Sequence, residues 1–141
     1  MNRLDPTQFI TKLSRNLDSI TEVEMRRTVS SLYFSLFNYW SEIKLCKLGK
    51  KGSGKHNDRF PLKEFSRDIT INNLSMEYQI LFELRVLCDH YTLNPNEIEI
   101  TDPEVRRMIN MPSIQITLNH VSLEDAVDYA KSINKWLKSL L

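Results

Sequence analysis

Residues 84–91 (LRVLCDHY) bring an arginine and a histidine that could act on a phosphate group close together near the end of an apolar stretch. Arg85 carries a permanent charge on a planar fork that matches phosphate oxygens. His90 titrates near neutral pH and can therefore transfer protons. These two side chains would suffice for phosphodiester cleavage without a metal ion, if RNA supplies its own 2′-hydroxyl as the nucleophile.

The same segment also has a purely structural interpretation. Arg85 and Asp89 are four residues apart, so they share one face of a helix and could form an ordinary ion pair. With arginine N-terminal to aspartate, an exposed pair adds at most a few tenths of a kcal/mol. Arg85 and His90 lie about 140° apart around an ideal helix. They converge only if the helix ends near His90 or if a second subunit completes the site.

A second candidate is the basic, glycine-bearing segment 49–61 (GKKGSGKHNDRFP), which contains the GxxxxGK part of a phosphate-binding loop. Such a loop needs a buried strand before it and a serine or threonine after the lysine. Here a long helical pattern precedes it and His56 follows Lys55, so we do not assign nucleotide hydrolysis. The segment is either a solvated loop or a contact for a polyanion or an acidic partner through its cations, Lys50, Lys51, Lys55 and Arg59.

The composition predicts one globular domain, residues 1–141. The chain has 141 residues, 41% hydrophobic and 26% charged, which is long enough for one core. Nineteen Lys+Arg against eighteen Asp+Glu leave a net charge of +1, which excludes an overall electrostatic attraction to nucleic acid or anionic membranes but permits a local patch. All three glycines fall in residues 49–54, and such scarcity disfavours a β-sandwich or barrel.

The cysteines and the N-terminus indicate a reduced, cytoplasmic protein. Cys46 and Cys88 lie in apolar helical patterns, and no CxxC or Cys/His cluster suggests a metal site, so we expect neither metal nor cofactor. The first residues are polar and lack the apolar core of a signal peptide. No stretch approaches eighteen apolar residues, so we expect no membrane span.

Apolar residues recur every three or four positions in most of the chain and predict helices over residues 5–20, 21–49, 62–71, 74–91 and 122–140. Thr21 with Glu24, and Ser122 with Asp125, are typical of capping boxes at two of the helix starts. Alternating residues predict strands at 97–100 and 114–118, around a helical turn near 102–109. The expected fold is mainly α, an up-and-down four- to five-helix bundle with a small β-hairpin excursion (about 97–118) before the last helix.

Three motifs follow one another in a recognisable order. They are an arginine before a paired-aromatic segment, a polar loop with a histidine, and an arginine followed after four residues by a histidine and a tyrosine. The arginine of the first motif is Arg27, the histidine of the polar loop is His56, and the third motif consists of Arg85, His90 and Tyr91. In this order and spacing the chain resembles the HEPN family (higher eukaryote and prokaryote nucleotide-binding domain), over roughly residues 20–93 and the last helix.

The resemblance implies a HEPN-like bundle that forms a homodimer, with the Arg85 and His90 residues of two protomers in a shared cleft. It also implies two alternative functions. One is a metal-independent endoribonuclease of toxin–antitoxin or defence type, in which Arg85 holds the phosphate and His90 moves protons. The other is a non-catalytic module that binds a nucleotidyltransferase-type partner, or a nucleotide or RNA. Candidate substrate- or partner-binding residues are Asp89, Tyr91, Arg27, Lys55 and His56.

Two departures from the family pattern keep both functions open. Val86 follows the arginine, where active relatives often have a polar residue. The segment also fits a subgroup written Leu-Arg-x-x-small-Asp-Tyr, with Cys88 and Asp89 in register and His90 in place of the tyrosine. That subgroup is not clearly catalytic.

Overall fold

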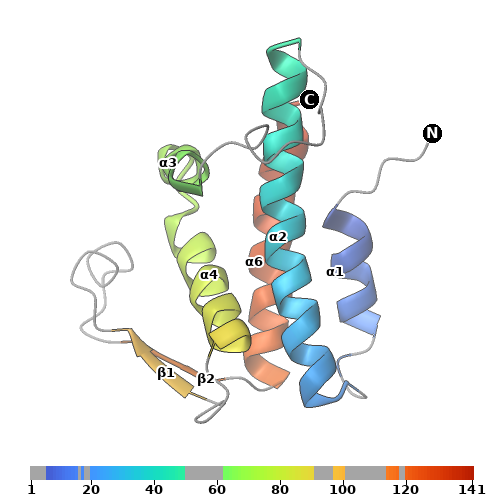
Figure 1. Cartoon of the computed structure of the whole chain (residues 1–141), viewed down its shortest axis with the longest axis vertical. Helices are drawn as coiled ribbons and strands as arrows, with labels where there is room; N and C mark the ends of the chain where they lie inside the picture. The colour runs from blue at the N-terminus through green and yellow to red at the C-terminus, as the bar shows by residue number, and fades with distance from the viewer. Residues whose placement is uncertain are drawn as a thin grey trace.

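The structure is a computed structural model that describes residues 6–15, 17, 20–49, 62–90, 97–100, 114–117 and 120–141. These residues form a helical bundle (Figure 1), which confirms the predicted mainly α fold. The described helices are α1 (Pro6–Arg15), α2 (Glu22–Lys47), α3 (Leu62–Ile71), α4 (Ser75–His90) and α6 (His120–Ser139). Helix α2 contacts α1, α4 and α6, with α1 and α4 on its opposite flanks, so it is the central element of the bundle.

Local signals determine both ends of α2. The Thr21 backbone N–H donates to Glu24 Oε2 (3.2 Å), and the Glu24 backbone N–H donates to Thr21 Oγ1 (3.3 Å). This is the predicted capping box, in which two otherwise unpaired N–H groups are satisfied reciprocally. At the other end, Gly49 has a φ of 68°. Glycine adopts this left-handed conformation without steric cost, so the helix ends just before it.

Three predicted boundaries are wrong. Helix α1 ends at Arg15 rather than near residue 20, although Leu17 and Ile20 still pack against the core. Helix α6 begins at His120, two residues before the predicted start, so Ser122 lies inside the helix and is not its cap. Helix α4 begins at Ser75, one residue after the predicted start, which is within the usual uncertainty of helix ends; its predicted last residue, Tyr91, lies outside the described residues. Asp5, the first residue of the predicted helix 5–20, lies outside the described residues.

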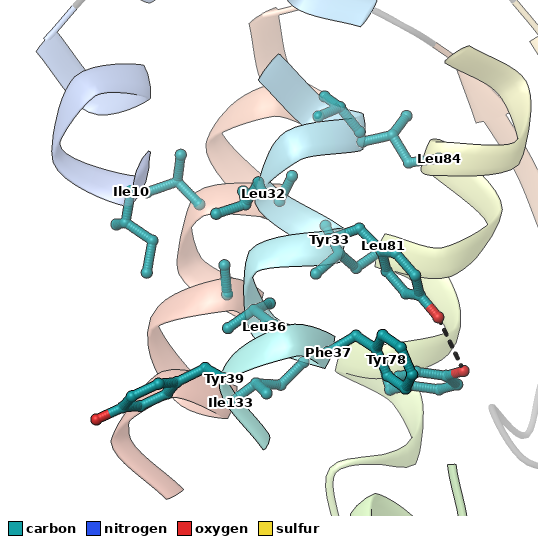
Figure 2. Packing of buried hydrophobic residues seen from close by; sticks show 14 of the residues in the cluster. Ile10, Leu32, Tyr33, Leu36, Phe37, Tyr39, Tyr78, Leu81, Leu84 and Ile133 are labelled. Carbon is teal, nitrogen blue, oxygen red and sulfur yellow. Dashed lines mark hydrogen bonds between the residues drawn. The ribbon is translucent and has the colours of Figure 1, made fainter. Parts of the chain in front are cut away.

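Large aromatic and aliphatic side chains of α2, α4 and α6 form the core (Figure 2). Tyr33, Phe37 and Trp40, which lie on the apolar stripe of α2, are 1%, 6% and 1% exposed, so this stripe packs in the core. Trp40 stacks on Phe65 of α3 with ring centroids 5.1 Å apart. Each such side chain contributes roughly 1.5–3 kcal/mol by leaving water, so the stripe stabilises the packing of α2 against its neighbours.

A carboxylate and an indole connect α3 to α2. The Trp40 Nε1–H donates to Asp68 Oδ2 (3.0 Å), and the Lys44 ammonium lies 2.9 Å from the same oxygen. Burial opposes ionisation of Asp68, but the hydrogen bonds from Lys44 and Trp40 outweigh it and lower the pKa of this carboxyl below its ordinary value. Helix α3 is therefore attached by a charge-assisted contact as well as by its apolar face.

Two short strands precede α6. Strands β1 (Glu97–Ile100) and β2 (Ile114–Thr117) pair antiparallel, with Ile98 opposite Ile116. Strand β2 contacts α4, and Figure 1 shows the pair beside the C-terminal end of that helix. The connection between the strands, including the turn predicted at 102–109, lies outside the described residues.

Candidate functional site

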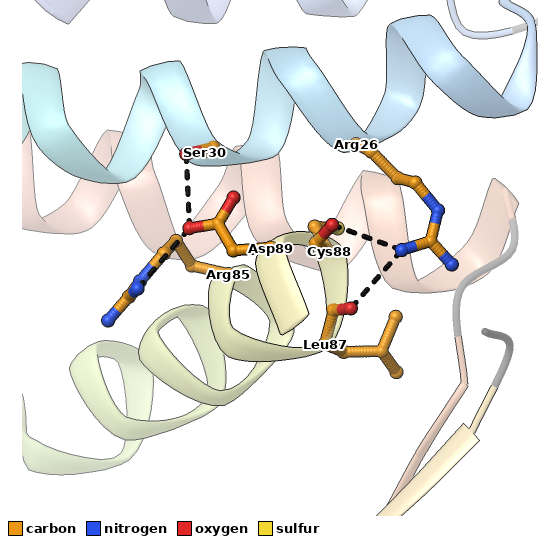
Figure 3. A network of polar contacts seen from close by, with 6 residues as sticks. All are labelled: Arg26, Ser30, Arg85, Leu87, Cys88 and Asp89. Carbon is orange, nitrogen blue, oxygen red and sulfur yellow. Dashed lines mark hydrogen bonds and ion pairs between the residues drawn. The ribbon is translucent and has the colours of Figure 1, made fainter. Parts of the chain in front are cut away.

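Arg85 and Asp89 form an ion pair on α4. Arg85 Nη1 lies 3.2 Å from Asp89 Oδ2, and the two side chains are 12% and 28% exposed. The same carboxylate oxygen accepts a hydrogen bond from the Ser30 hydroxyl of α2 (3.3 Å; Figure 3). The pair therefore belongs to the contact between α4 and α2, and it is more buried than an ordinary surface ion pair.

Three aromatic rings surround the guanidinium of Arg85. Its Cζ lies 5.0 Å from the centroid of the Phe82 ring, 5.2 Å from that of Tyr33 and 5.4 Å from that of Phe34. At these distances the negative ring faces attract the cation. The Arg85 Nε–H is buried and finds no acceptor among the described residues. The guanidinium is therefore held by one carboxylate and by rings, and most of its surface is removed from water.

A pair of buried tyrosines lies beside this arginine. The Tyr33 and Tyr78 hydroxyls are 3.2 Å apart (Figure 2). Burial is the main cause that raises the pKa of both phenols above their ordinary value, and the charge of Arg85 only partly opposes it. Both tyrosines therefore stay protonated over the physiological pH range.

Arg26 of α2 caps the end of α4. Its Nη1 donates to the backbone carbonyl oxygens of Leu87 (3.2 Å) and Cys88 (3.0 Å), as Figure 3 shows. These are among the last carbonyls of α4, which lack partners within the helix and carry its negative dipole end. The sequence patterns did not predict this role for Arg26. A usable signal was that Arg26 lies three and seven residues before the buried Val29 and Tyr33, hence on the inward face of α2.

Cys88 does not supply a nucleophile to this cluster. The residue is 6% exposed, and burial raises the pKa of its thiol to about 12. Because the thiolate is the reactive form, a thiol with this pKa stays inert at neutral pH. It acts as a small apolar side chain of the core.

The structure brings together only part of the predicted site. Arg85 and Asp89 meet side chains of α2, whereas Arg27 is exposed on α2. His90 is the last residue of α4, and its side chain is not described. Tyr91, Lys55 and His56 lie outside the described residues.

The described residues contain neither a metal-binding cluster nor a membrane-spanning helix. Within the part of the chain that the structure describes, no three histidine, cysteine or carboxylate side chains lie close enough to hold a metal ion. Over the same residues, no helix has the length and hydropathy that crossing a bilayer requires. Comparison of the chain with protein-family models, with curated proteins and with solved structures gives no match in any of the three.

Proposed function

We propose that the chain is a HEPN-like, up-and-down helical module that acts by binding and not by catalysis. Its ligand would be a partner protein, for example a nucleotidyltransferase, or a nucleotide or RNA. The observation that supports this proposal is the environment of Arg85, which is 12% exposed and paired with Asp89. A homodimer is part of the proposal, as the family resemblance implies.

The chemistry of phosphate cleavage makes this environment informative. A catalytic arginine must present its N–H groups to a phosphate, with no competing anion next to it. Here Asp89 already accepts from Nη1, and its negative charge would repel a phosphate brought to the same place. Moving Arg85 out would also break its contacts with three rings. An arginine that stabilises the α2–α4 contact accounts for all of these features.

One observation favours the alternative, a metal-independent endoribonuclease. Arg85 and His90 converge only if the helix ends near the histidine or a second subunit contributes, and His90 is the last residue that the structure describes in α4. In that case Arg85 would hold the scissile phosphate after leaving Asp89, and His90 would act as general base or acid. The product would carry a 2′,3′-cyclic phosphate.

An RNA-cleavage assay separates the two functions. Purified protein is incubated with mixed-sequence RNA in EDTA, beside Arg85→Ala, His90→Ala and, as a matched control, Arg15→Ala, which removes an exposed arginine of α1. We expect intact RNA with every protein. Cleavage by the wild type that Arg85→Ala and His90→Ala both abolish and Arg15→Ala retains would overturn the proposal in favour of the ribonuclease.

Binding and assembly are measured on the same preparation. Fluorescence anisotropy of a labelled RNA and titration with ATP test the nucleic-acid and nucleotide ligands directly. Light scattering after gel filtration tests the homodimer, which would have twice the chain mass of 16.6 kDa. A monomeric protein that binds neither probe would restrict the proposal to a protein partner and would remove the homodimer from it.

A further inference from the structure

A groove is lined by residues of α1 and α2. It encloses about 300 Å³, at the small end of the range for ligand pockets. Three aromatic rings line it, Phe9 from α1 and Phe34 and Tyr39 from α2. Phe34 is 36% exposed, which is high for a phenylalanine on a packed helix. The groove therefore presents aromatic surface that the bundle itself does not cover fully.

The polar lining of the groove consists of neutral amide and hydroxyl groups and one carboxylate. Glu42 is exposed and is the only fully charged side chain among the lining residues. Asn38 adds an amide, and Ser31 and Ser35 add hydroxyls. The Ser35 hydroxyl donates its proton to the Leu32 carbonyl oxygen (2.7 Å), so its oxygen remains an acceptor for a ligand. Among the residues that the structure describes, the lining includes no lysine or arginine that would balance Glu42.

This combination selects one class of ligand group. Aromatic faces and a carboxylate together attract a flat organic cation, for which both cation–π and charge-assisted contacts are available. A guanidinium fits better than a compact ammonium because it is planar, stacks on rings and is more weakly hydrated. A phosphate group would be repelled by Glu42 and would find no cation in the groove.

We propose that this groove receives an arginine side chain presented by a partner protein. Its volume suits one long side chain, and its charge is complementary to that of arginine. The inference goes beyond the proposed function, because it uses none of Arg85, Asp89 or His90. It would survive the finding that the protein cleaves RNA.

The test uses the peptide acetyl-Gly-Arg-Gly-amide as the probe and follows the aromatic proton–carbon NMR signals of the full chain. The arginine peptide shifts the Phe9, Phe34 and Tyr39 signals in a saturable manner. The same peptide with norleucine in place of arginine, which has an apolar stem and no charge, leaves these signals unchanged. Equal shifts with norleucine would show a purely apolar groove and would overturn the proposal.

Two further measurements test whether Glu42 contacts the arginine and whether the cation comes from a protein or from a small molecule. Glu42→Gln weakens binding of the arginine peptide by about fivefold, the upper end for an exposed charge pair. The matched control Glu124→Gln, an exposed carboxylate on α6, leaves the affinity unchanged. Unchanged affinity in Glu42→Gln would overturn the assignment. Equally tight binding of free methylguanidinium would assign the groove to a small-molecule cation and overturn the choice of a partner protein.

Discussion

Arg85 and Asp89 lie one turn apart on α4 with Nη1 and Oδ2 separated by 3.2 Å, and this intrahelical pair is part of the contact between α4 and α2. The order of the two residues is the weaker one for a pair on an isolated helix. The pair nevertheless stabilises the contact between the two helices, because Ser30 donates to Asp89 and because Tyr33 and Phe34 flank Arg85. All three partners belong to α2.

Arg85→Ala is expected to lower the free energy of unfolding by about 2–3 kcal/mol, because it removes a largely buried stem with its cation–π contacts and leaves the carboxylate unpaired. Asp89→Ala should cost less, about 1 kcal/mol, because that side chain is more exposed. Urea denaturation followed by circular dichroism measures both. Arg27→Ala serves as the control and should change stability by no more than about 0.5 kcal/mol. Equal, small effects of all three substitutions would contradict a structural role for the pair.

Arg26→Ala should destabilise the protein by about 1–2 kcal/mol, because two carbonyl oxygens at the end of α4 lose a charged donor. Arg26→Lys should recover only part of this, since an ammonium lacks the planar fork. Amide hydrogen exchange of the last turn of α4, compared with that of α1, locates the effect. Faster exchange spread evenly over both helices would show that Arg26 does not act as a local cap.

The contact of Asp68 with Trp40 and Lys44 should make stability depend on pH. Its pKa is lower in the folded than in the unfolded protein, so the unfolded state binds the proton more tightly. The stabilisation is therefore fully present above the ordinary carboxyl value of about 3.9 and is lost as the pH falls through the folded value. The difference in unfolding free energy between wild type and Asp68→Asn should be constant above about pH 5 and shrink below it.

Asp128→Asn, which removes an exposed carboxylate of α6, is the matched control for that titration. Unfolding is measured by urea denaturation at each pH, with both variants compared with the wild type. A difference for Asp68→Asn that grows on acidification would contradict the sign derived from the lowered pKa.

The two cysteines should differ in their reactivity. Burial raises the pKa of Cys88 to about 12, whereas Cys46 is exposed. At pH 8, iodoacetamide should modify Cys46 and leave Cys88 unmodified in the folded protein, because the reagent attacks the thiolate. Peptide mass spectrometry measures both sites. In urea the two sites should react alike, and equal rates without urea would mean that Cys88 is accessible in the native state.

Sequence patterns predicted those parts of the fold that depend on neighbouring residues. Thr21 and Glu24 satisfy each other's backbone groups within one turn, so the start of α2 needs no distant partner. The end of the same helix at Gly49 follows from the left-handed backbone that glycine favours. The short helix over residues 62–71 was predicted with the bounds that the structure shows. The prediction that Arg85 could pair with Asp89 is local in the same sense and is confirmed.

The sequence by itself thus determined where the helices lie and how α2 begins and ends, and it placed Arg85 and Asp89 on one helix face, because each of these depends on residues within a few positions of one another. Only the tertiary structure decided how deeply Arg85 is buried, because the rings of Tyr33 and Phe34 reach it from another helix. It also decided which of two adjacent arginines caps the end of α4, since packing turns Arg26 toward Leu87, 61 residues away, and leaves Arg27 exposed. Contacts across such separations depend on how the helices pack against one another, and spacing along the chain does not contain that information.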